Sequence, residues 1–159
     1  MVVSAKLRLS TLIAFLASRA CKGERTVVFM STCDGVDYHH ALFTSMPSIF
    51  GDEHKENDEN GIFGKSCPVY KLHGDIPHSQ RLSTLKHFAG EKGLHQQNSA
   101  ILIATDVAAR GLNLQSLDWI VQYDPPCETN DYIHRGEICA FVLTSFTFQP
   151  CPNQLSNKL

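Results

Sequence analysis

The sequence predicts an α/β fold in which helices cover both faces of a mostly parallel sheet. Residues 27–30 are a continuous apolar run of strand length, which is typical of a central strand that is buried on both faces, and residues 100–105 are a second strand-like run. Segments with the apolar spacing of helices separate these runs from the other strand-like runs. The chain of 159 residues is long enough for one such domain with a real core and too short for two ordinary ones.

The composition is that of a folded globular protein. Hydrophobic residues make up 43% of the chain and charged residues 19%, which excludes a disordered tail. The formal net charge of −2 gives no overall basic field, so nucleic-acid binding would have to rest on a local basic patch. No segment reaches the ~20 apolar residues that a membrane span requires, so no membrane partner is expected.

Residues 1–21 fit two different interpretations. Two basic residues precede an apolar run and the small-residue stretch ASRA, which is the outline of a signal peptide. Polar residues interrupt the run, however, and its large apolar side chains recur at i, i+3, i+4 and i+7. These side chains are Leu9, Leu12, Ile13 and Leu16. Their spacing favours an amphipathic helix that packs one face against the core.

The elements that follow the first strand alternate as the fold class requires. Asp34 is expected to cap a helix that runs through residues 36–43. An acidic, polar loop at about residues 51–61 is expected as an insertion. Residues 68–74 then form a short strand that ends in glycine.

The second half of the chain repeats this alternation. A helix at residues 76–90 has Pro77 near its start, and Gly90 ends it. Its expected apolar face consists of Leu82, Leu85 and Phe88. The further expected elements are the strand at residues 100–105, a strand at 117–124, a turn at Pro125 and Pro126, a short helix at 128–135 and a final strand at 138–146.

Neither the cysteines nor the histidines have the spacing of a metal or disulfide framework. The six cysteines show no CxxC pair, so we expect buried or unreactive thiols in a reducing compartment. None of the eight histidines has helical metal spacing with a carboxylate partner, so no metal site is expected.

The most informative segment is ATDVAARGLN, residues 104–113. Ligands of parallel sheets bind beyond the carboxyl ends of the strands, and this segment leaves a strand at that position. Thr105 and Asp106, exposed backbone amides, and Arg110 beside Gly111 are what a phosphate-binding loop needs. In the alternative interpretation, Thr105 and Asp106 cap a helix and Arg110 pairs with a surface carboxylate.

Four segments occur in a fixed order at successive strands: VVFMST, LHGDIPHSQR, ATDVAARGLN and DWIVQYDPPCETNDYIHR. Together they resemble the second RecA-like domain of a DEAD-box ATP-dependent RNA helicase, over roughly residues 6–135. The resemblance implies a RecA-like domain at residues 1–135, which includes the acidic insertion, followed by a divergent tail at residues 136–159. Because the match stops directly after His134 and Arg135, this single domain is expected to be incomplete.

Three features also look like the nucleolar DEAD-box helicases of large-ribosomal-subunit assembly. They are the segment KLRLSTLIAFL, the insertion before KLHGD, and the segment WIVQYDPP. This likeness implies a role in ribosome biogenesis and rRNA processing, pre-ribosomal assembly factors as partners, and a location in the nucleus and nucleolus.

The resemblance implies that the chain grips single-stranded RNA by its sugar-phosphate backbone, since such contacts position a strand without reading its bases. Thr32 would donate its hydroxyl to a phosphate, and Gly74 would bring its backbone close to the strand. Arg81 would pair with a phosphate. Thr105 and the turn around Gly111 would complete the track.

On the ATP side, the resemblance implies roles at the contact between domains for Asp106, Arg110, Asn113, His134 and Arg135. Asn113 stands where the family has an acidic residue that touches the nucleotide ribose. Ile138 and Phe141 stand where the family has two arginines that stabilise charge on the γ-phosphate, and neither side chain can stabilise an anion.

ATP and Mg²⁺ are therefore expected as cofactors of a full-length family member and not of this chain alone. The 159 residues contain neither a GxxxxGK[ST] loop nor an Asp-Glu-Ala-Asp string. Both would be supplied by a first RecA-like domain, in cis in a full-length protein. No catalytic centre is complete in this chain, which is expected to be inactive by itself.

The tail at residues 136–159 does not continue the family pattern, and two explanations stay open. It is either a truncated or misassembled gene product, or a genuine alternative end whose run at residues 138–146 restores an edge strand. Two other functional classes also stay open. One is an interaction module that docks on a partner helicase domain or assembly factor, and the other is a non-functional product.

Overall fold

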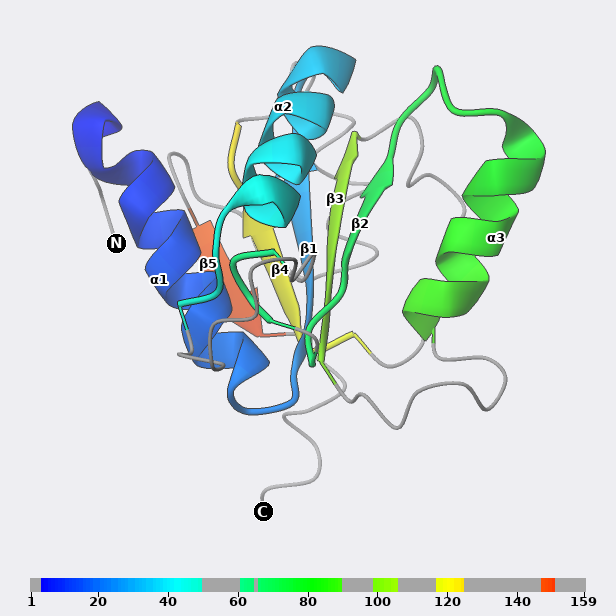
Figure 1. The fold of residues 1–159 in the computed structure, drawn as a ribbon. Helices are drawn as coiled ribbons and strands as arrows, with labels where there is room; N and C mark the ends of the chain where they lie inside the picture. Colours follow the sequence, from blue (N-terminus) through cyan, green and yellow to red (C-terminus); the bar gives the residue numbers. More distant parts are fainter. Residues whose placement is uncertain are drawn as a thin grey trace.

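The computed structural model describes residues 4–49, 61–64, 66–89, 99–105, 117–124 and 147–150 (Figure 1). The helices in these ranges are η1 (Ala5–Leu7), α1 (Arg8–Ala20), α2 (Cys33–Ser45) and α3 (His78–Ala89). The strands are β1 (Arg25–Met30), β2 (Val69–Leu72), β3 (Ala100–Thr105), β4 (Trp119–Gln122) and β5 (Thr147–Pro150). The predicted strands at residues 27–30, 68–74, 100–105 and 117–124 are confirmed, and so are the helices predicted between the first three of them.

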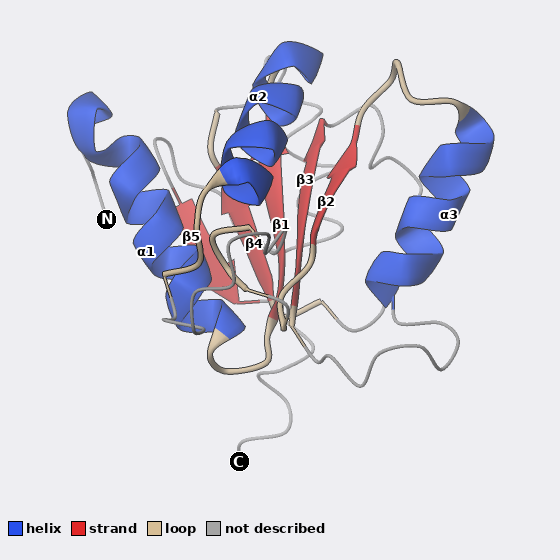
Figure 2. Cartoon of the chain, in the orientation of Figure 1, coloured by secondary structure: helices blue, strands red, loops and turns tan. Residues whose placement is uncertain are grey.

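The strands form one sheet in the order β2-β3-β1-β4-β5 (Figure 2). The first four strands in this order run parallel, and β5 pairs antiparallel with β4. The central strand β1 places Val28 opposite Ile103 on one side and opposite Val121 on the other. The mostly parallel sheet that the sequence predicts is confirmed.

Helices cover both faces of this sheet, as the buried central strands β1 and β3 require. On β1, Val28 and Met30 belong to one buried cluster, which also contains residues of α1 and α2. Val27 and Phe29 point the other way, into a second cluster that contains Phe88 of α3. Figure 1 shows α1 and α2 over one part of the sheet and α3 beyond β2. The predicted fold class, an α/β sheet with helices on both faces, is therefore confirmed.

Helix α1 has the amphipathic character that its spacing predicts. Leu12 and Leu16 are fully buried, and Leu9 and Ile13 pack against the same core cluster. The helix interpretation of the first residues is thus confirmed for Arg8–Ala20. Among the residues that the structure describes, no helix is long and apolar enough to cross a bilayer.

The cap of α2 is Thr32 and not Asp34, so that detail of the prediction is wrong. Thr32 has an extended backbone, and its Oγ1 accepts a hydrogen bond of 3.1 Å from the backbone N–H of Gly35. Asp34 lies in the first helical turn. Its carboxylate there still faces the positive end of the helix dipole, which is why it marks a helix start without being the cap.

The expected apolar face of α3 is also partly wrong, because Leu82 is 46% exposed. Phe88 is buried and Leu85 packs against the same cluster. Leu82 and Phe88 are six residues apart, which is a rotation of about 600° around an α-helix, so their side chains point about 120° apart. The face of α3 that packs on the sheet carries Phe88 and Leu85 and leaves Leu82 outside it.

Several predicted features lie outside the described residues. They are the acidic loop at about residues 51–61 apart from Gly61, the turn at Pro125 and Pro126, the helix at 128–135 and the strand at 138–146. The strand that the structure does describe in this part of the chain, β5, begins directly after residue 146.

Candidate functional site

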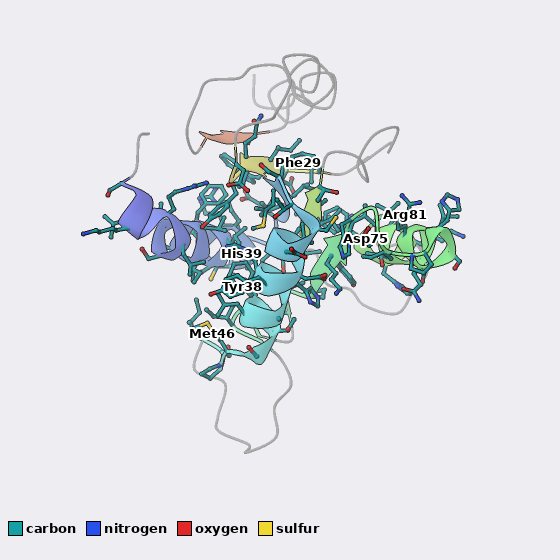
Figure 3. The ribbon with its side chains drawn as sticks, turned by 90° about the horizontal axis from the view of Figure 1, so that it is seen from above. Phe29, Tyr38, His39, Met46, Asp75 and Arg81 are labelled. Atoms are coloured by element: carbon teal, nitrogen blue, oxygen red, sulfur yellow. The ribbon has the colours of Figure 1, made fainter. Side chains whose placement is uncertain are left out.

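The candidate site lies at the edge of the sheet where the parallel strands end, which we call the carboxyl edge. Ser31 and Thr32 follow β1, His73 and Gly74 follow β2, and Thr105 is the last residue of β3. Met30 pairs with Thr105 across the two strands, which places these ends side by side. The carboxyl edge is uppermost in Figure 1, and Figure 3 looks down on it.

Thr32 presents its hydroxyl at the start of α2. Its oxygen already accepts the N–H of Gly35, so the hydroxyl hydrogen is the part of the group that can be donated to a ligand. An added Cβ at Gly35 would lie 2.9 Å from this oxygen, which explains the glycine at that position. Thr32 is exposed. A phosphate that accepts a hydrogen bond from its hydroxyl would also lie at the positive end of the α2 helix dipole.

Gly74 offers open space beside the backbone. A Cβ built at this position would have no neighbour within 4 Å, and the residue is exposed. Its φ is not positive, and among the glycines that the structure describes the positive values occur at Gly23, Gly61 and Gly64. Neither packing nor backbone conformation therefore requires a glycine at position 74. A ligand that approaches the main chain closely would require one.

Arg81 lies in the first turn of α3 and is half-buried. Its backbone N–H bonds to the carbonyl of Pro77, at 3.0 Å. Among the residues that the structure describes, its Nε has no hydrogen-bond partner. Figure 3 shows Arg81 and Asp75 on the same side of the sheet, next to α3. A guanidinium placed in this way can bind an anion at the carboxyl edge.

Thr105 belongs to the same edge but is less accessible than Thr32, because only 6% of it is exposed. The remaining predicted site residues lie outside the described residues. They are Asp106, Arg110, Gly111, Asn113, His134 and Arg135. The structure therefore brings together Thr32, Gly74, Arg81 and Thr105 from the predicted set and describes none of the predicted ATP-side residues.

A network of charged groups supports the segment after β1. Asp124 accepts a hydrogen bond of 3.1 Å from the backbone N–H of Ser31, and its other carboxylate oxygen lies 3.1 Å from Arg8. The Arg8 guanidinium stacks over the ring of Tyr123, at 4.4 Å from the ring centre. These contacts fix the residue directly before Thr32. The segment YDPP is recognisable in the sequence, but nothing in the sequence indicates that its Asp124 accepts a hydrogen bond from Ser31.

A second network of charged groups joins α2 to the end of β2. Lys71 Nζ lies 2.5 Å from Asp37 Oδ1, and this contact is the main reason why the pKa of Asp37 is lowered. His73 Nε2 lies 3.3 Å from the same oxygen. The pKa of His40, on the same helix as Asp37, is lowered chiefly by burial. A cleft of about 410 Å³ opens beside these groups, between β2 and α3.

The fold also brings Cys33, His73 and Asp75 together, with one ligand atom from each lying within 4.8 Å of the others. No local spacing could reveal this group, because Cys33 follows β1 and the other two follow β2. The group does not fit Mg²⁺, the metal of the helicase family, because that ion prefers oxygen ligands and this set contains a thiol and an imidazole.

Comparisons with known proteins add to this geometry. The family described as "Helicase conserved C-terminal domain" matches residues 7–137. The ATP-dependent RNA helicase dbp7 of Schizosaccharomyces pombe is 38% identical over 148 residues, which cover 84% of this chain and 20% of that protein. The DEAD-box ATP-dependent RNA helicase 17 of Oryza sativa subsp. japonica is 38% identical over 135 residues, which cover 84% of this chain and 22% of that protein.

A solved structure has the same fold. It is domain 2 of the Mss116p DEAD-box helicase bound to an RNA duplex, with a TM-score of 0.61 and 20% sequence identity. The likeness covers 87% of this chain and 47% of that one. The chain described here spans about a fifth of the length of the curated relatives that it matches.

Proposed function

Because the chain belongs to the family of helicase conserved C-terminal domains, we propose that it binds the sugar-phosphate backbone of single-stranded RNA at its carboxyl edge. The assignment to the second RecA-like domain of a DEAD-box RNA helicase, made from the order of its motifs, is confirmed. The single observation that carries the proposal is the open space at Gly74 on the carboxyl edge.

The three groups at this edge suit a phosphate backbone and not a base. Thr32 supplies a hydroxyl hydrogen, Gly74 an unobstructed main chain, and Arg81 a cation. None of them has the paired donor and acceptor geometry that distinguishes one base edge from another. Binding is therefore expected to depend on salt and to vary little with RNA sequence. A solved structure with the same fold was obtained with an RNA duplex, which supports RNA as the ligand class.

The experiment that tests this proposal is a salt titration of RNA binding with Arg81→Gln. Each phosphate contact to a single strand contributes about 0.7 to the slope of log affinity against log salt concentration. Arg81→Gln is expected to weaken binding of a labelled oligonucleotide and to lower this slope by about 0.7. Lys86→Gln is the matched control, because Lys86 is an exposed cation in the last turn of the same helix.

If Arg81→Gln and Lys86→Gln weakened RNA binding equally, a specific role for Arg81 would be contradicted, since general charge attraction would then explain the binding. Loss of RNA binding in Arg81→Gln with retention of a protein partner would favour an interaction module instead. Circular dichroism of each variant establishes that the fold is retained before affinities are compared.

The ATP site is proposed to be completed only by a first RecA-like domain. The phosphate loop and the Asp-Glu-Ala-Asp string are absent from the 159 residues, and Ile138 and Phe141 occupy the positions of the family arginines. ATP and a divalent metal would then act only in the full-length protein. The chain alone is expected to show no ATP turnover in a phosphate-release assay, and robust hydrolysis by it would refute this part of the proposal.

The biological setting is proposed from two similarities. The segments KLRLSTLIAFL and WIVQYDPP look like those of nucleolar helicases of large-subunit assembly. Several of the most similar relatives carry the name dbp7. A role in ribosome biogenesis, with assembly factors as partners, is accordingly proposed for the full-length protein. Imaging of the tagged protein in cells is expected to show nucleolar signal, and exclusion from the nucleolus would contradict this role.

A further inference from the structure

The Cys33–His73–Asp75 cluster joins three metal-ligand types at the carboxyl edge. A thiol sulfur, an imidazole nitrogen and a carboxylate oxygen all lie within 4.8 Å of one another. Cys33 is the first residue of α2, and the other two belong to the loop that follows β2. Within the described ranges, no other group of three or more His, Cys, Asp or Glu side chains meets this distance.

His73 is the group that distinguishes this cluster from an ordinary surface arrangement. Only 4% of the residue is exposed, and neither ring nitrogen has a hydrogen-bond partner among the described residues. Nε2 lies 3.3 Å from Asp37 Oδ1, which is an ion-pair distance, whereas Nδ1 lies 3.9 Å from Asp75 Oδ2, which is beyond hydrogen-bond distance. A buried nitrogen without a close partner is costly, so a ligand that binds Nδ1 stabilises the ring.

We propose that Cys33, His73 and Asp75 form a binding site for a divalent transition-metal ion of the zinc class. Thiolate and imidazole are softer ligands than carboxylates alone, and together they select zinc-like ions over Mg²⁺ and Ca²⁺. The thiol proton is released to solvent when the ion binds. The imidazole would bind through Nδ1, on the side of Asp75, while Nε2 faces the Asp37 carboxylate. A carboxylate behind the second nitrogen is the usual support of a metal-binding histidine.

The distances allow the cluster to close around an ion. Ligand atoms of a tetrahedral zinc site lie roughly 3.3–3.8 Å apart, so the widest separation in the cluster has to shrink by about 1 Å. The Asp75 side chain is 80% exposed, and its Oδ2 already lies 3.9 Å from His73 Nδ1. Three protein ligands leave the fourth position open to water or to a ligand from the adjoining cleft.

The site is independent of the proposed RNA binding, although the two are neighbours. Cys33 follows Thr32, and His73 and Asp75 flank Gly74. Metal binding is therefore tested without RNA, and its outcome does not depend on whether the chain binds RNA.

The test is a Co²⁺ titration of the full chain in metal-free buffer, followed by optical absorption. Thiolate coordination produces a sulfur-to-cobalt charge-transfer band, and added Zn²⁺ is expected to displace Co²⁺ and remove the band. Cys33→Ser is expected to abolish the band. Asp75→Asn, at an exposed side chain, is expected to keep the fold and to weaken Co²⁺ binding at least about tenfold. Cys21→Ser is the matched control, because Cys21 is an exposed free thiol at the end of α1.

Each outcome decides the proposal. A band that is lost in Cys33→Ser, weakened in Asp75→Asn and unchanged in Cys21→Ser supports the site. Absence of the band in the unmodified chain overturns it. A band that survives Cys33→Ser also overturns it, since the coordinating thiol would then lie elsewhere in the chain.

Discussion

Gly61 and Gly74 differ in what the structure requires at their positions. Gly61 has a φ of +62°, and a Cβ there would lie 2.5 Å from the carbonyl oxygen of Phe43. Gly74 has neither a left-handed backbone nor a neighbour within 4 Å. The fold requires glycine at position 61, whereas only a bound ligand would require it at position 74. Measuring the stability of variants at both positions therefore distinguishes the two roles.

Gly61→Ala is expected to lower the free energy of unfolding by more than 1 kcal/mol, on the order of the cost of a strained non-glycine backbone. Gly74→Ala is expected to change it little, or to raise it by up to about 1 kcal/mol through the entropy of the unfolded chain. Urea unfolding of both variants measures the difference. A large loss of stability in Gly74→Ala would contradict the open space at that position.

Cys67 gives the chain a defined dependence of stability on alkaline pH. Burial raises the pKa of its thiol from 9.0 to about 11. Because the raised pKa favours the neutral thiol in the folded state, its contribution is complete below pH 9 and is lost as pH rises toward 11. The loss amounts to about 3 kcal/mol over this window. Cys67→Ala is expected to flatten the decline in a series of urea titrations from pH 8 to pH 11.

An unchanged slope in Cys67→Ala would contradict this assignment and point to other groups that titrate in the same window. Tyr70 and Tyr123, whose pKa values burial also raises, are the described tyrosines that contribute there. The comparison of slopes is independent of the stability that the Cys67→Ala cavity itself removes.

Helix α2 connects the core of the sheet to the candidate site, because its N-cap residue is also a proposed ligand contact. Val36 and Phe43 anchor the helix in the core, and the Thr32 oxygen satisfies the N–H of Gly35. The Asp124 carboxylate holds the N–H of Ser31 just before the cap. The position of the Thr32 hydroxyl is therefore set by a helix and a neighbouring strand together.

Thr32→Ala is expected to destabilise the protein by about 1 kcal/mol, which is the usual cost of removing an N-cap hydroxyl. Thr32→Ser keeps the oxygen that accepts from Gly35 and is expected to retain most of this stability. Thermal unfolding of the two variants measures the difference. Equal destabilisation by both substitutions would show that the methyl group and not the cap is responsible.

Most elements could be predicted from the sequence because their signals are local. Residues 27–30 of β1 and 100–104 of β3 are apolar without interruption, and Leu12 and Leu16 recur at helical spacing in α1. Two details could not be predicted in this way. The choice of Thr32 over Asp34 as the cap depends on where β1 ends, and the exposure of Leu82 depends on how α3 is rotated against the sheet.

At the scale of the whole molecule, the candidate site is an assembly of strand ends that the sequence separates widely. Motif order identifies Thr32, Gly74, Arg81 and Thr105, and the parallel sheet places the ends of their strands at one edge. The Cys33–His73–Asp75 cluster could not be predicted, because its members come from two segments that share no local spacing. The contact of Asp124 with Ser31 has the same origin, since it joins the ends of two parallel strands.

The most direct test of RNA binding at the carboxyl edge is the RNA affinity of Gly74→Val, measured together with its thermal unfolding. A Cβ at this position meets no atom within 4 Å, so valine is expected to fill the space beside the main chain without displacing a protein contact. The predicted result is an RNA affinity at least about tenfold lower, about 1.4 kcal/mol, with an unchanged melting temperature. An RNA affinity equal to that of the unmodified chain, with the fold intact, would contradict the proposal that the RNA backbone passes over Gly74.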